Sequence, residues 1–167
     1  FEGARRRKQS EEGIENLRQC VDTLITIPNQ RLISIANERT TLKEAFAMAD
    51  RVLYQAVKGV SDLINFQGIV NVDFADVKKI MKESGGKALM GTGEGEGTSR
   101  AIEAAENAIT SPLLEDISIE GATGILINVT ASSNFTIDEL NEACNHIKSK
   151  ANPNVELIFG LVVNEVL

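Results

Sequence analysis

The stretch TLKEAFAMADRVLYQAVKGVSDLI, residues 41–64, carries the strongest pattern in the sequence. Apolar residues recur along it at spacings of three and four, which is typical of an amphipathic helix. Thr41 and Glu44 have the spacing of a capping box, so the helix is expected to begin there. It should run for about 24 residues, or about 36 Å. Its broad apolar stripe predicts a central element that is packed on both sides.

A short break follows this helix and leads into GIVNVDFADV, residues 68–77, which places Asp73 and Asp76 three residues apart. One interpretation makes them the N-cap and first turn of a helix that runs to about Glu83. Another makes them a pair that orients and polarises water for attack on a phosphoryl group, with Asn71 as a neutral neighbour. The two interpretations are compatible, because a helix N-terminus holds carboxylates in fixed directions.

The remaining segments alternate between helical and extended patterns, which predicts an α/β layer architecture. Asn29 is a plausible N-cap for the second predicted helix. We expect helices at 5–24, 29–36, 99–109 and 136–150, strands at 23–28, 124–131 and 154–163, and a strand, glycine-rich turn and helix start within 87–100.

Composition excludes several classes of protein. The net charge of −7 argues against nucleic-acid binding, and the absence of Trp removes a stacking platform for bases. No apolar run approaches the ~18 residues of a membrane span. Cys20 and Cys144 form no metal-ligand pattern, so we expect no metal site and free, buried thiols in a reducing cytoplasm. Both chain ends are expected to be cut from a longer protein.

Two further features have ordinary interpretations. The segment GTGEGEGTS, residues 91–99, has the glycines of a phosphate cradle. It lacks the lysine of a Walker-type loop, however, and Glu94 and Glu96 would repel phosphate. A flexible strand-to-helix connection is therefore favoured. His146 is expected to be an exposed residue without function.

Several segments together carry a family resemblance. VDTLITIPNQRL, AFAMADRVLYQAVKGVSDLI, GIVNVDFADVKKIM, AIEAAENAITSPLLE and GILINVTA occur in this order along the chain. In these motifs the sequence resembles the FtsZ family of tubulin-like division GTPases over essentially its whole length. The resemblance implies an incomplete tubulin/FtsZ α/β fold. Residues 1–40 would end a Rossmann-like GTP-binding subdomain, residues 41–65 would form the central helix, and residues 66–167 would form a smaller, truncated α/β subdomain.

The resemblance also implies a mechanism for the acids. Subunits of this family stack head to tail, and GTP on one subunit is covered by the loop after the central helix of the next. That loop carries Asn-x-Asp-x-x-Asp, matched here by Asn71, Asp73 and Asp76. The two aspartates would position and polarise the attacking water with help from a cation, and Asn71 would support the geometry. The implied location is cytoplasmic, at the division septum.

Nucleotide contacts follow from the same resemblance. GTP or GDP with Mg²⁺ is the implied cofactor. An aspartate can accept hydrogen bonds from guanine N1 and N2, and an asparagine can both donate and accept. Arg6 is the matched arginine, and Arg5 and Arg7 on either side of it could take its role. The matched positions are Glu2 and Arg6 near ribose and phosphates, Asn29 and Asp50 at guanine, and Phe46 against the base.

The implied partners are other copies of the chain, and division proteins and membrane tethers that bind a tail absent here. The parent would be a GTPase, whereas this piece, without the family's phosphate loops, is expected to be inactive alone. Two alternatives stay open. One is a tubulin-like paralogue used in cell shape or DNA segregation. The other is an α/β scaffold domain whose acids are helix caps only.

Overall fold

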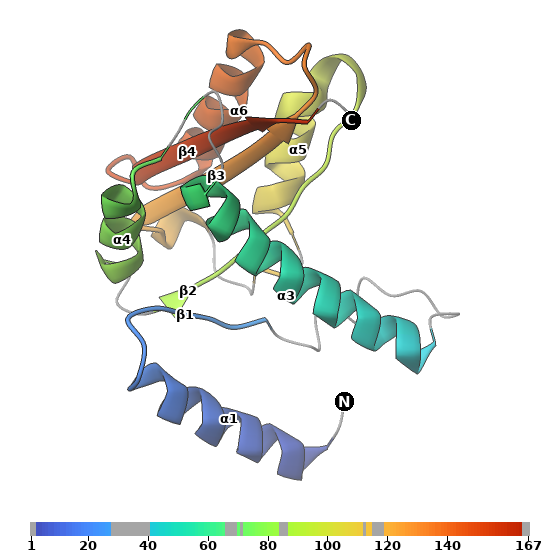
Figure 1. Ribbon diagram of the computed structural model, residues 1–167, viewed down its shortest axis with the longest axis vertical. Coiled ribbons are helices and arrows are strands. Elements are labelled where there is room, and N and C mark those ends of the chain that lie inside the picture. Colours follow the sequence, from blue (N-terminus) through green and yellow to red (C-terminus); the bar gives the residue numbers. More distant parts are fainter. Residues whose placement is uncertain are drawn as a thin grey trace.

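The computed structural model describes residues 3–27, 41–65, 70, 72–83, 87–111, 113–114 and 119–164 (Figure 1). The predicted strands at the C-terminal end of the chain, and the helices beside them, are confirmed within a few residues. The elements are α1 (Ala4–Arg18), β1 (Leu24–Ile25), α3 (Leu42–Asn65), α4 (Phe74–Glu83), β2 (Lys87–Ala88), α5 (Arg100–Ile109), β3 (Gly124–Ala131), α6 (Ile137–Lys150) and β4 (Glu156–Val163), with short 3-10 turns at Gly97–Ser99 and Ile119–Gly121.

The long helix α3 has the 24 residues that the sequence predicts. Its capping box is formed: the Thr41 amide donates to Glu44 Oε2 at 2.7 Å, and the Glu44 amide donates to Thr41 Oγ1 at 3.3 Å. One face buries Val52, Ala56 and Leu63. In the part of the chain that the structure describes, the opposite face is open. It exposes Phe46, Leu53, Tyr54, Val57 and Ile64.

Strands β3 and β4 pair in parallel, from Gly124 beside Glu156 to Ala131 beside Val163. Successive side chains of a strand point to opposite faces, so alternate residues meet different helices. Asn128 donates from Nδ2 to the Gly59 carbonyl of α3 at 3.1 Å. That face of the sheet is therefore covered by α3, together with α4.

The other face of the sheet is covered by α6. Leu140 is buried in one cluster with Ala131 and Leu161, and Cys144 packs against it. The helix α5 lies along α6, as Figure 1 shows. The sheet is thus the middle layer of a three-layer arrangement, which confirms the predicted α/β architecture.

The glycine-rich segment before α5 is an extended chain packed directly on that helix. A Cβ atom added at Gly91, Gly93 or Gly95 would lie closer than 3.0 Å to a backbone carbonyl oxygen of α5, at Ala108, Ala104 and Arg100 in that order. Each step of two residues along the extended segment thus matches four residues along the helix. We call residues 91–95 the glycine strip. The segment connects β2 to α5 as predicted, but it is extended where a turn was expected. Its glycines serve close approach to the helix.

The N-terminal part differs from the sequence prediction. The helix α1 ends at Arg18 instead of continuing to residue 24, and none of its residues is buried. Leu24 lies instead in β1, which pairs in parallel with β2. Cys20 is a free but exposed thiol, so the prediction of burial is wrong for it. The predicted second helix and its cap at Asn29 lie outside the described residues.

Candidate functional site

The acid pair lies at the N-terminus of α4. Asp73 Oδ1 accepts a hydrogen bond from the Ala75 amide at 3.1 Å. The Asp73 carbonyl accepts from the amides of Asp76 and Val77 at 3.0 and 3.2 Å. Asp73 is therefore the N-cap, as the sequence predicts, and Asp76 lies in the first turn. Both carboxylates are exposed, where the positive end of the helix dipole favours negative charge. Asn71 lies outside the described residues.

The body of α4 is anchored to the sheet. Val77 and Ile80 are 3% and 6% exposed. The Ile80 side chain occupies the space beside Gly124, where a side chain on residue 124 would otherwise lie. Lys79 Nζ lies 2.8 Å from Glu156 Oε1, at the start of β4. The helix thus presents its N-terminal acids outward from a fixed base.

Two of the predicted nucleotide residues lie together on α3. Phe46 and Asp50 are four residues apart, so they share one helix face. Both are exposed, Phe46 by 42%. Ile27 and Ala49 pack against the cluster of Val52 and Leu113, which brings the segment after β1 next to the turn that carries Asp50.

The other predicted nucleotide residues are less completely placed. Arg6 lies in the first turns of α1. Glu2 and Asn29 lie outside the described residues. The structure therefore brings Phe46 and Asp50 together on one element, and the closing of a pocket by the other three stays a prediction.

The acid pair and the two residues predicted to contact the base, Phe46 and Asp50, lie toward opposite ends of α3. Asp50 is 15 residues before the end of the helix, a rise of about 22 Å. In the view of Figure 1, α4 lies toward the C-terminal end of α3, and Phe46 and Asp50 belong to the N-terminal half of α3. A rise of this size places the acids well away from Asp50 of the same chain.

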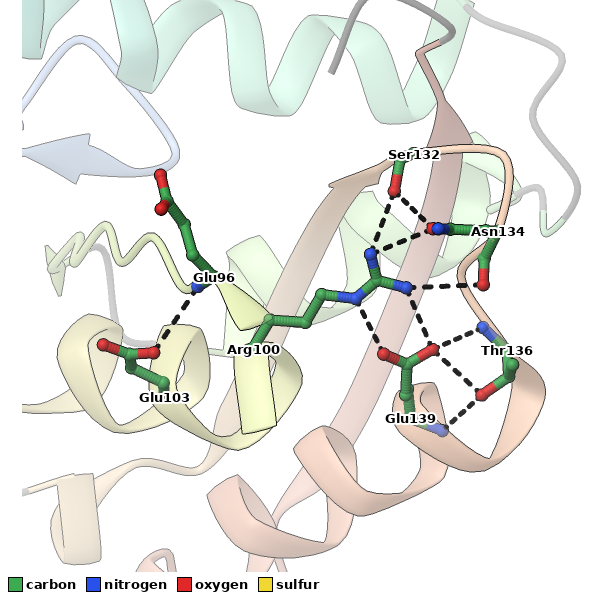
Figure 2. Close-up of polar contacts among 7 residues, drawn as sticks. All are labelled: Glu96, Arg100, Glu103, Ser132, Asn134, Thr136 and Glu139. Atoms are coloured by element: carbon green, nitrogen blue, oxygen red, sulfur yellow. Dashed lines mark hydrogen bonds and ion pairs between the residues drawn. The ribbon is translucent and has the colours of Figure 1, made fainter. Parts of the chain in front are cut away.

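Arg100 forms a polar cluster that the sequence did not reveal (Figure 2). Its Nε and Nη2 donate to the two carboxylate oxygens of Glu139 at 2.7 and 3.2 Å. Its Nη1 donates to Ser132 Oγ and Asn134 Oδ1 at 3.1 and 2.9 Å, and Nη2 also donates to the Asn134 carbonyl at 3.3 Å. The guanidinium lies 5.6 Å from the Phe135 ring centroid. All five N–H groups thus have acceptors.

The cluster also fixes the start of α6. Thr136 and Glu139 form the predicted capping box, with the Thr136 amide donating to Glu139 Oε2 at 2.8 Å. Arg100 and the Thr136 hydrogen bonds hold the pKa of Glu139 at about 2. The carboxylate is therefore charged at any physiological pH. The cluster is a structural joint between α5, the loop after β3 and α6, rather than an anion site, because its cation is already saturated.

His146 forms a second joint between α5 and α6. Its Nε2 lies 2.6 Å from Glu106 Oε2, and the histidine side chain is 25% exposed. The prediction of an exposed residue was wrong, because its partner is 40 positions away in the sequence. The hydrogen bond from His146 lowers the pKa of Glu106. Among the described residues, no group of three or more His, Cys, Asp and Glu side chains could hold a metal ion.

Comparison with solved structures defines the class of fold. A structure titled "FtsZ dimer, empty", from M. jannaschii, matches with a TM-score of 0.86 and 45% identity, over 93% of this chain and 45% of that one. CetZ from Methanosaeta thermophila matches with a TM-score of 0.68 at 15% identity, over 87% and 40% of the two chains, and shares the fold alone. The molecule is therefore an incomplete α/β fold of the tubulin/FtsZ class.

Sequence comparison narrows the class to a family. The model described as "FtsZ family, C-terminal domain" matches residues 86–167. The "Cell division protein FtsZ" of Magnetospirillum gryphiswaldense is 53% identical over all 167 residues. The chain covers 30% of that relative's length. The chain belongs to the FtsZ family.

Proposed function

We propose that this chain is part of a polymerising GTPase of cell division, in which Asp73 and Asp76 act on the nucleotide of the adjacent subunit. The observation that carries the proposal is the separation of the acid pair from Phe46 and Asp50 along α3. Acids that cannot reach their own nucleotide can serve a neighbour's when subunits stack head to tail. Hydrolysis then depends on assembly.

The chemistry follows from the position of the acids. The Asp73 carboxylate is held by its cap, and the backbone of Asp76 is fixed in the first turn of α4, so both side chains start from defined positions before a partner arrives. Together with Asn71 they would orient a water molecule. The carboxylates would accept hydrogen bonds from its O–H groups while its oxygen attacks the γ-phosphate. Phe74 lies between them in the sequence and is 57% exposed. It would exclude solvent, other than the attacking water, from the contact between subunits.

The nucleotide side uses the other end of α3. Asp50 would accept hydrogen bonds from guanine N1 and N2, and Phe46 would pack on the base. Asn29 would complete base recognition, and Glu2 and Arg6 would contact ribose and phosphates. Mg²⁺ would accompany the GTP, and no described residue of this chain is assigned as its ligand.

The organisation of the longer protein is part of the proposal. Residues 1–40 would complete the GTP-binding subdomain, residues 41–65 would be the central helix, and residues 66–167 the second subdomain. The exposed apolar face of α3 supports this division, because a GTP-binding half on that side would cover it. Copies of the chain would be the main partner, and a tail would recruit division proteins and membrane tethers at the division site. None of the described helices is long and apolar enough to cross a bilayer.

One mutation tests the catalytic role. In a full-length chain that carries these residues, Asp76→Ala should abolish GTP turnover and leave GTP binding nearly intact, measured by phosphate release and nucleotide titration. The alternative, in which the acids are helix caps only, rests on the hydrogen bond that Asp73 Oδ1 accepts from the Ala75 amide. That alternative predicts full turnover in Asp76→Ala, and such a result would remove the proposed mechanism.

A further inference from the structure

The C-terminal turn of α4 is bonded to a distant part of the chain. Thr23 Oγ1 donates to the Met81 carbonyl at 2.6 Å, across 58 positions of sequence. Met81 lies among the last four residues of α4, whose carbonyls have no partner within the helix. Thr23 therefore donates to a carbonyl in the last turn of α4. Asp22 adds an ion pair with Lys82, 3.8 Å between Oδ1 and Nζ.

The segment that carries Thr23 also reaches the nucleotide side of the molecule. It continues through β1 to Ile27, which packs against the cluster of Val52 and Leu113 together with Ala49, the neighbour of Asp50. Asn29, the other base-contact candidate, follows two residues later in the sequence. Residues 22–27 thus contact α4 at one end and the cluster of Val52 and Leu113, beside the predicted base contacts of α3, at the other.

The acids at the opposite end of α4 are sensitive to the direction of the helix. Asp73 lies eight residues before Met81, a rise of about 12 Å. A tilt of about 5° at the C-terminal turn moves a point at that distance by about 1 Å, and a displacement of this size can reduce a reaction rate by about 10²-fold. Val77 and Ile80 restrain the middle of the helix, so the loss from removing a single contact should be smaller.

We propose that Thr23 is a positioning residue for the acid pair. Its hydrogen bond to Met81 contributes to the direction of α4, and therefore to the direction of Asp73 and Asp76 at the partner's nucleotide. It also makes that direction depend on the segment that leads to the chain's own guanine contacts. Binding of the guanine base by a subunit would thereby influence the direction of the acids that the subunit presents to the adjacent subunit. The inference rests on the proposed function.

The test compares Thr23→Val, which removes the donor at nearly constant volume, with Thr23→Ser, which keeps it. Both are made in a full-length chain carrying these residues, and GTP affinity, polymer mass by sedimentation and phosphate release per polymerised subunit are measured. Thr23→Val should lower turnover per polymerised subunit by roughly 3- to 10-fold, with affinity and polymer mass unchanged. Thr23→Ser should restore turnover. If Thr23→Val does not fold, Thr23→Ala against Thr23→Ser supplies the same comparison.

Three outcomes would overturn the inference: unchanged turnover in Thr23→Val, equal loss in the serine variant, or a loss that merely follows reduced polymer mass. A merely structural role would lower the melting temperature without changing turnover per polymerised subunit. Asp76→Ala serves as the reference. Full turnover in Asp76→Ala contradicts the proposed function itself. Lost turnover there, with unchanged turnover in Thr23→Val, contradicts the positioning role alone.

Discussion

Replacing Gly93 with alanine should destabilise the chain, because the glycine strip has no room for a methyl group. The added Cβ would lie within 3.0 Å of backbone atoms of Ala104, Asn107 and Ala108, whereas ordinary contact begins at 3.4 Å. All three neighbours belong to the backbone of α5. No side-chain rotation can relieve the overlap, so the strip and the helix must move apart.

Two opposing effects set the magnitude. Overpacking of a close contact costs roughly 1–3 kcal/mol. Alanine also restricts the unfolded chain, which offsets about 0.4–1 kcal/mol. The overlap involves three rigid backbone atoms, so the upper half of the overpacking range applies and the net destabilisation is about 1–2.5 kcal/mol. For a chain of this size that corresponds to a fall in melting temperature of roughly 2–10 °C.

The assay is thermal unfolding followed by circular dichroism, with Gly121→Ala as the matched control. A Cβ at Gly121 meets nothing within 4 Å, and its φ is not positive. The control should therefore melt within about a degree of the parent chain, since surface changes away from special features have small effects. If Gly93→Ala has the same melting temperature as Gly121→Ala, the close packing described for the glycine strip is wrong.

Two other substitutions test the polar contacts. Because Arg100 holds the pKa of Glu139 at about 2, below the ordinary 4.5, the stability from Glu139 is complete above about pH 4.5 and is lost as the pH falls toward 2. Glu139→Gln should therefore flatten the acid side of a plot of melting temperature against pH, and an unchanged slope would contradict this account of the Arg100 cluster. Asp73→Ala should lower the free energy of unfolding by about 1 kcal/mol through loss of the α4 cap, while Asp73→Asn should keep it; equal urea midpoints for the two variants would show that the cap contributes nothing.

The sequence predicts elements whose causes are local. The capping boxes at Thr41 and Thr136 each involve a glutamate three residues later, and both form as expected. The cap at Asp73 is also local, so the start of α4 could be read directly. The β-branched run at 124–131 becomes β3 with the predicted bounds. These signals depend on neighbours in the chain, which a single sequence displays.

Contacts between distant segments were not predictable in the same way. Arg100 looks like an ordinary first-turn residue, and its partners lie 32 to 39 positions away. The glycine strip looked like a flexible connection, because the helix that requires its glycines cannot be identified from spacing alone. The pairing of β1 with β2 likewise depends on register across more than 60 residues, and it ended α1 earlier than its apolar spacing suggested.

The candidate site divides along the same line. The resemblance implies roles for four residues: Asp73, Asp76, Phe46 and Asp50. All four are exposed, as contact with a molecule outside the chain requires. The contact of Thr23 with α4 could not be foreseen, because a threonine before a short strand has no distinctive pattern.

The glycine strip has a consequence for insertions and deletions. Its odd positions face α5, and its even positions, Thr92 and Glu94, are exposed, as is Glu96 just after it. Loss of one residue would turn a threonine or glutamate side chain into the helix, whereas loss of a neighbouring pair would return glycine to each contact. The parity of a length change, rather than its size, should therefore decide whether it is tolerated. Related chains should vary here in steps of two.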